Sequence, residues 1–107
     1  MPTDRLGGFE ELVLLATASL RGAGYGVTIQ EAIEAETGQT VAVGAVYATL
    51  DRLERKGLVT SREGSPTRER GGRRTRLFRV SAAGMRALSE MQRIRGALRE
   101  AIEAKPS

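Results

Sequence analysis

The chain has 107 residues, 40% of them hydrophobic and only 4% aromatic, which is enough for one small domain with an aliphatic core. It contains no cysteine and no histidine, so disulfides, thiolate metal sites and histidine-based acid–base catalysis are excluded. The net charge is +4. Residues 62–79 contain seven arginines and two glutamates, a balance of +5, so the rest of the chain carries a net charge of −1. This concentration predicts an anionic partner that is contacted at one place.

The first apolar segment predicts a buried helix from Phe9 to Leu20. Its apolar residues recur at helical spacing, with Leu14 and Leu15 widening the stripe, at Phe9, Leu12, Val13, Ala16 and Leu20. The segment is too short for a bilayer and is interrupted by Glu10 and Glu11, and the N-terminus lacks the features of a signal peptide. We therefore expect a cytoplasmic protein without a membrane span.

Two further helices are predicted after a glycine-rich turn over residues 21–26. The second starts near Thr28, where Thr28 and Glu31 have the spacing of a capping box, and Gly38 is a plausible stop. The third covers roughly Val43 to Lys56 and is closed by Gly57.

The rest of the chain predicts a β-hairpin and a last helix. Strand character appears at residues 58–63 and 74–81, on either side of a polar, arginine-rich loop over residues 64–73. The helix after Ser81 carries an apolar stripe that needs either the first helix or another subunit as its partner. The stripe consists of Met85, Leu88, Met91, Ile94, Leu98 and Ile102.

Three helices followed by a hairpin is the element order of a winged helix-turn-helix. We therefore expect a mainly α fold with a small β-hairpin. Residues 1–81 would form a DNA-binding domain, and residues 82–107 would form a dimerisation helix.

The third helix is predicted to bury a seam of Val46, Leu50, Leu53 and Gly57 and to face outward with small and basic residues. A solvated surface explains this face equally well when the helix is considered alone. The arginine-rich loop beside it favours duplex DNA, since two positive elements then meet on one face. Arg52 is the best candidate for a base contact, and Arg73 and Arg74 for groove or phosphate contacts.

Three segments, over residues 25–38, 44–59 and 74–88, resemble the PadR family of bacterial transcriptional regulators. The most specific part is the pattern of glycine, tyrosine and leucine running from Gly44 through Tyr47 to Leu58. The resemblance implies that the third helix is a recognition helix, that Tyr47 touches the DNA backbone, that the hairpin is the wing and that the last helix forms a homodimer through its stripe. The DNA-binding set that we derive from the face, the loop and this resemblance is Thr40, Gly44, Ala45, Tyr47, Ala48, Arg52, Arg55, Arg68, Arg70, Arg73 and Arg74.

The sequence departs from the family pattern at three points. Ala48 stands where the family often has proline, and Ala42 and Val43 stand where a serine or threonine cap is expected, so that Thr40 or no residue caps the helix. Some members of the family with only one helix after the wing bind flat aromatic compounds through tryptophan, but this chain contains no tryptophan. A small-molecule effector is therefore possible but unsupported, and no cofactor or metal is expected.

These observations predict a homodimeric repressor that binds double-stranded DNA at a pseudo-palindromic operator. The main alternative is a winged-helix module for protein–protein interaction, which would not need the concentrated arginines. An RNA-binding role is less well supported because few aromatic side chains are available for stacking. An enzyme is least supported: the candidate carboxylate groups, at residues 10–11 and 31–36, are expected on helix surfaces without catalytic partners.

Overall fold

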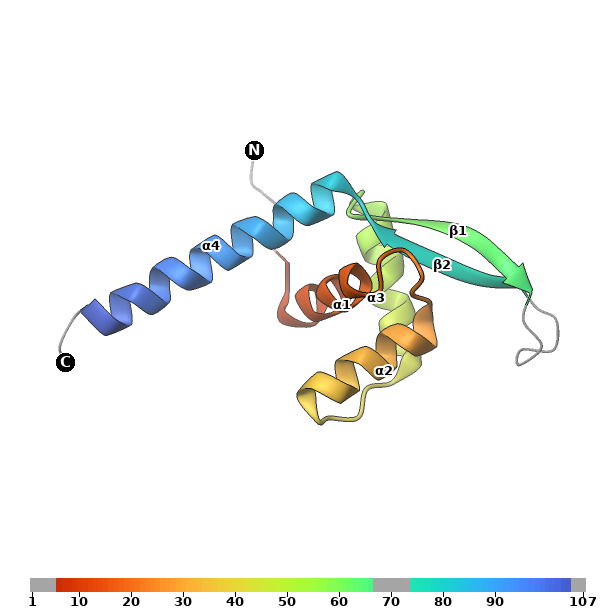
Figure 1. Cartoon of the computed structure of the whole chain (residues 1–107), viewed down its shortest axis with the longest axis horizontal. Coiled ribbons are helices and arrows are strands. Elements are labelled where there is room, and N and C mark those ends of the chain that lie inside the picture. The colour runs from red at the N-terminus through yellow and green to blue at the C-terminus, as the bar shows by residue number, and fades with distance from the viewer. Residues whose placement is uncertain (1–5, 67–73, 105–107) are drawn as a thin grey trace.

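Four helices and one antiparallel hairpin follow one another along the chain in the order expected for a winged helix-turn-helix (Figure 1). The structure is a computed structural model that describes residues 6–66 and 74–104. The elements are α1 (Gly8–Ser19), α2 (Gly26–Thr37), α3 (Val43–Arg55), β1 (Val59–Pro66), β2 (Arg74–Val80) and α4 (Ala82–Ala104). The mainly α fold class with a small hairpin is thereby confirmed.

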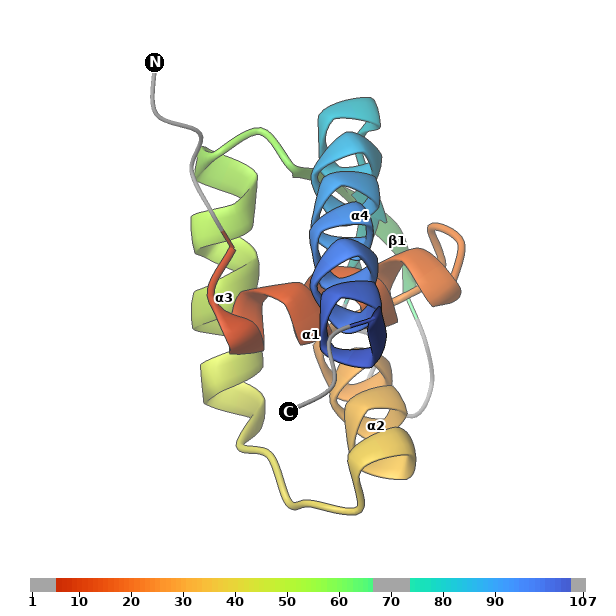
Figure 2. The same ribbon diagram turned by 90° about the vertical axis from the view of Figure 1, so that its left-hand side faces the viewer.

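One aliphatic core joins α1 to the elements around it. Figure 2 shows α1 between α3 and α4, and α2 packs against both α1 and α3. Phe78 of β2 is the largest fully buried side chain and closes the core on the hairpin side. The other fully buried apolar side chains, from α1, α2, α3 and β1, are Val13, Leu14, Ile29, Val46, Leu50, Leu53, Val59 and, nearly so, Ile33.

The buried face of α1 differs from the predicted stripe. Leu12 and Leu15 are 39% and 46% exposed, whereas Glu11 and Thr17 are buried. Thr17 is accommodated because its hydroxyl donates a 2.7 Å hydrogen bond to the Val13 carbonyl. The prediction was wrong at Leu12 and Leu15, because both side chains line an open groove instead of the core.

The start of α2 also differs from the prediction. The helix begins at Gly26, and Thr28 lies in its first turn instead of capping it. The Thr28 hydroxyl reaches back to accept a 3.0 Å hydrogen bond from the Tyr25 N–H, while Glu31 is exposed. The stop at Gly38 is confirmed, since Gly38 has a φ of 71° and donates to the Glu34 carbonyl.

The hairpin register places Ser61 opposite Phe78 and Glu63 opposite Arg76, with an irregularity between Glu63 and Pro66. Phe78 additionally donates a 2.9 Å backbone hydrogen bond to Gly24, which forms an isolated bridge beside β2. The turn between α1 and α2 is thus attached to the sheet, which the sequence alone did not predict.

The first half of α4 packs on the body, and its second half extends away from it (Figure 1). Ser81 begins this arrangement: its hydroxyl accepts from the Gly84 N–H at 3.0 Å and donates to the Gly57 carbonyl at 2.7 Å. Leu88 is 8% exposed and belongs to the core of its own chain, so the expectation that it faces a partner is corrected. Leu98 and Ile102 are 62% and 71% exposed. Within the described ranges, no helix is long and apolar enough to cross a membrane.

Candidate nucleic-acid interface

The turn between α2 and α3 is held by two side chains of α2 that bind the same residue. Gln30 donates a 2.6 Å hydrogen bond to the Val41 carbonyl, and a Glu34 carboxylate oxygen accepts a 2.7 Å hydrogen bond from the Val41 N–H. Residues four apart on a helix share one face, so both side chains reach the turn together. The position of Val41, two residues before α3, is therefore fixed by α2.

The helix that follows begins without a side-chain cap. Ala42 is the N-cap residue and has no side chain able to accept from the first turn, and the exposed Thr40 does not replace it. Of the two possibilities that the sequence left open, the one without a cap is the one observed.

The outer face of α3 is the face predicted from helical spacing. Val46, Thr49, Leu50 and Leu53 are buried on the inner side. Gly57, which was predicted in the same buried seam, is exposed because it lies beyond the end of the helix. The predicted outward residues are all exposed, namely Thr40 in the turn and Gly44, Ala45, Ala48, Arg52 and Arg55 on the helix. Small side chains at the start of this face leave its backbone open to close approach by a ligand surface.

Tyr47 lies at the edge of this face, with 36% of its surface exposed. Its ring covers Gly26 at the start of α2, where an added Cβ would lie only 2.1 Å from the tyrosine Cζ and 2.5 Å from its hydroxyl oxygen. The absence of a side chain at Gly26 therefore allows the ring to pack there and keeps the phenol at the surface.

Arg52 is exposed but is engaged by α1. Its Nε lies 3.4 Å from a carboxylate oxygen of Glu10, and the Lys56 ammonium donates to the same carboxylate at 3.2 Å. The Gly7 N–H donates to Glu10 at 3.0 Å. This backbone hydrogen bond, followed by the contacts to Lys56 and Arg52, lowers the pKa of Glu10 below its ordinary value.

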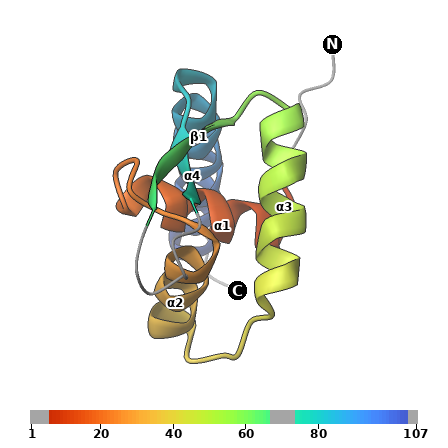
Figure 3. The ribbon, with the colours of Figure 1, turned by 90° about the vertical axis from the view of Figure 1, so that its right-hand side faces the viewer.

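The opposite edge of α3 is joined to the hairpin. Arg76 of β2 makes ion pairs with Glu54 and, at 3.5 Å, with Asp51. Figure 3 looks at the hairpin from its outer end and shows α3 beside it. These ion pairs join the hairpin to the C-terminal half of α3, at Asp51 and Glu54.

The structure does not describe most of the predicted wing. Arg68, Arg70 and Arg73 lie outside the described residues, and Arg74 opens β2 opposite Pro66. β1 ends at Pro66 and β2 begins at Arg74, at the end of the described hairpin that is distant from α4 (Figure 1).

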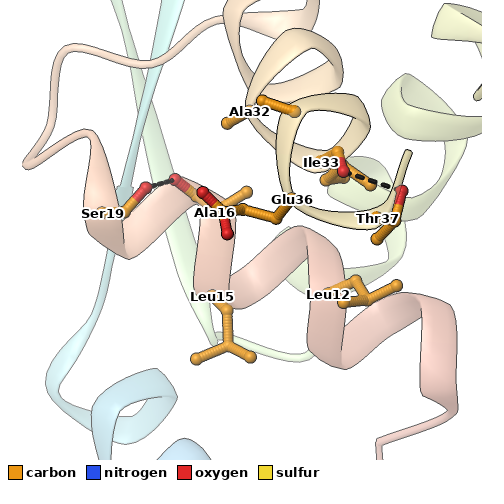
Figure 4. Close-up of a pocket in the computed structure, with 9 residues that line it drawn as sticks. Leu12, Leu15, Ala16, Ser19, Ala32, Ile33, Glu36 and Thr37 are labelled. Atoms are coloured by element: carbon orange, nitrogen blue, oxygen red, sulfur yellow. Dashed lines mark hydrogen bonds between the residues drawn. The ribbon is translucent and has the colours of Figure 1, made fainter. Parts of the chain in front are cut away.

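An apolar groove lies apart from this face, between α1 and α2 (Figure 4). It has a volume of about 470 Å³ and is bordered by Leu12, Ala16, Ala32 and Ile33, while Leu15 points away from α2. The groove continues the exposed apolar surface of α1.

A recognition helix with an open outer face, set on a fixed turn and beside an attached hairpin, defines a winged helix-turn-helix domain. Residues 14–90 match the transcriptional regulator PadR-like family. The chain belongs to this family and is a DNA-binding transcriptional regulator, as the resemblance of its motifs implied.

Solved structures of the same family have the same fold. A PadR-like transcription factor from Bacteroides fragilis shares 20% identity over 90% of this chain and 87% of its own, with a TM-score of 0.74. A PadR-like transcriptional regulator from Bacillus cereus shares 16% identity over 90% and 88%, with a TM-score of 0.71. A PadR family transcriptional regulator from Eggerthella lenta shares 25% identity over 87% and 79%, with a TM-score of 0.69. No curated protein matches the sequence closely enough to count as a relative.

Proposed function

We propose that the chain is a cytoplasmic repressor that binds a pseudo-palindromic DNA operator as a homodimer. The observation that carries the proposal is the outer face of α3, which is exposed along its length while four sets of polar contacts fix the helix on the domain. Each copy would place this face in a major groove and its wing arginines along the adjacent backbone or minor groove.

The dimer part of the proposal is supported by apolar surface that one chain leaves uncovered. The second half of α4 exposes Leu98 and Ile102, and α1 exposes Leu12 and Leu15. A two-fold arrangement lets each chain offer both surfaces to its partner, as an isologous interface requires. Of the predicted stripe, the residues proposed to face the partner are Met85, Met91, Ile94, Leu98 and Ile102.

The DNA face is tested by fluorescence anisotropy with a labelled duplex from the intergenic region beside the gene and with a random duplex. We expect Arg52→Ala and Arg55→Ala each to weaken specific binding by about tenfold, because an arginine that contacts a base or phosphate contributes on the order of 1–3 kcal/mol. The double variant Arg73→Ala/Arg74→Ala should lower the salt dependence, with the slope of log K against log salt falling by about two.

Arg99→Ala on α4 is the matched control, since Arg99 is exposed far along the last helix and away from the proposed face. It should bind DNA like the natural protein. Unchanged affinity in both the α3 variants and the wing variant would show that the DNA face has been placed wrongly.

A further inference from the structure

Arg76 is the centre of a closed group of polar contacts that joins both strands of the hairpin to α3. Its guanidinium pairs with Glu54 and lies 3.5 Å from an Asp51 oxygen, and its Nε donates to the Ser61 hydroxyl at 3.1 Å. The Ser61 hydroxyl in turn donates to the second Glu54 oxygen at 2.8 Å. We call Arg76, Ser61, Glu54 and Asp51 the Arg76 clamp.

The clamp follows from the alternation of β2. Arg76 and Phe78 are two residues apart and therefore share one strand face, which is the face turned to the domain. The Arg76 guanidinium lies 5.0 Å from the centre of the Phe78 ring, and this stacking holds the planar group in the orientation that its carboxylate partners need. Each of its three nitrogens has a partner within the chain, while 47% of the side-chain surface is exposed.

The position of the clamp along the hairpin determines which part of the hairpin it holds against α3. Phe78 anchors β2 in the core, whereas Arg76 lies further out, two residues from the start of the strand. A contact at that distance controls how the outer part of the hairpin is inclined to α3. It also offsets part of the negative charge of Asp51 and Glu54, two carboxylates beside the surface that a polyanion would approach.

We propose that Arg76 is a positioning residue for DNA binding, which holds the hairpin at the angle to α3 at which both elements reach one duplex. This inference rests on the DNA-binding role proposed above. It assigns Arg76 a function that differs from that of the wing arginines, although all of them belong to the same positive segment of the sequence.

Glu54→Gln provides the decisive test, because a pure charge effect and the loss of the clamp predict opposite changes in DNA affinity. Removing a carboxylate beside DNA should strengthen binding if only charge matters, whereas opening the clamp should weaken it by about tenfold. Affinity is measured by anisotropy with the labelled intergenic duplex at several salt concentrations. Glu31→Gln, which removes an exposed carboxylate from α2, is the matched control and should not weaken binding.

Two further variants distinguish a positioning role of Arg76 from a direct contact between Arg76 and DNA. Arg76→Glu should weaken binding, and the swap Arg76→Glu/Glu54→Arg should restore most of the affinity at unchanged net charge. Thermal unfolding of every variant shows whether the domain still folds, and Glu54→Gln keeps the test valid if Arg76→Glu does not.

The inference is overturned if Glu54→Gln binds as tightly as the natural protein or more tightly. It is also overturned if the swap gives no recovery while Arg76→Ala lowers the salt slope by about one, because Arg76 would then contact a phosphate directly. Failure of the natural protein to bind any duplex would instead reject the proposed function and this inference with it.

Discussion

At the scale of single residues, two glycines of α4 have opposite surroundings. A Cβ at Gly84 would lie 2.2 Å from the Leu58 carbonyl oxygen, whereas a Cβ at Gly96 would meet nothing within 4 Å. Gly84 therefore permits the first turn of α4 to touch the backbone of the turn after α3. Gly96 has no such role within the described part of the chain.

We accordingly expect Gly84→Ala to lower the free energy of unfolding by about 1–3 kcal/mol, because backbone atoms must move apart. Gly96→Ala should raise it by about 0.5–1 kcal/mol, because alanine loses less conformational entropy in a helix. Urea denaturation at one fixed protein concentration measures both variants. Equal effects of the two substitutions would contradict the close packing of α4 at Leu58.

Glu10 predicts a pH-dependent contribution to stability. Its pKa in the folded protein is lowered, chiefly by the Gly7 N–H and then by Lys56 and Arg52, so its stabilising effect is complete above the ordinary value of 4.5 and is lost as the pH falls through the folded value. Glu10→Gln should therefore cost about 1–2 kcal/mol at neutral pH, and this difference should shrink in acid.

The measurement is chemical denaturation of both proteins between pH 3 and 7. Glu100→Gln removes an exposed carboxylate from α4 and should follow the natural protein throughout. A difference between Glu10→Gln and the natural protein that stayed constant across this range would show that the carboxylate charge is not what stabilises the contact.

At the scale of elements, α3 is fixed at four places along its length. The turn before it is bound by α2, one edge by Glu10, the other edge by the Arg76 clamp, and its C-terminal turn by Ser81 through the Gly57 carbonyl. None of these contacts uses the central outer residues Ala48 and Arg55. The fold therefore orients the helix from its flanks and leaves the middle of the face available.

The bounds of α3 could be predicted from sequence because local signals end it. Gly57 has a φ of 78°, a backbone conformation that glycine adopts readily, and Leu58 donates back to the Leu53 carbonyl as in a Schellman turn. The inner and outer faces followed from the helical spacing of Val46, Leu50 and Leu53 in the same way.

The contacts that position α3 could not be predicted, because their partners are distant in sequence. Glu10 meets Lys56 across 46 positions, and Arg76 meets Glu54 across 22. Glu10 and Glu11 were expected on a helix surface as solvated groups, yet both side chains are nearly covered and ion-paired. The adjacent apolar residues Leu77 and Phe78 interrupt strict alternation in β2, so the sequence left open which face of the hairpin carries Arg76.

At the scale of the whole molecule, two neighbouring residues of α1 form ion pairs with two different helices, α3 and α4. Glu10 binds the recognition helix through Lys56 and Arg52, and Glu11 binds Arg95 of α4. Because Glu11 is buried beside the core, its ion pair with Arg95 ties α4 to the domain. In the proposed dimer, α1 would therefore connect each recognition helix to the dimerisation helix.

We expect Leu98→Glu to raise the dissociation constant of the dimer by at least tenfold, about 1.4 kcal/mol, because a charge would enter the apolar surface between the chains. Ala97→Glu places the same charge on the neighbouring position, away from the stripe, and should leave the dimer unchanged. Sedimentation equilibrium over a range of concentrations distinguishes them. A natural protein that remained a monomer at all concentrations would reject the pairing.

The exposed second half of α4 has a consequence for how DNA binding by such a regulator depends on its own concentration. In the proposed dimer, a single copy would contact one half-site and only a dimer would contact both, so promoter occupancy would depend on the square of the protein concentration while dimers are scarce. Doubling the protein concentration would then raise the bound fraction about fourfold instead of twofold. The exposed end of α4 would in this way make promoter occupancy respond more steeply to a change in protein concentration.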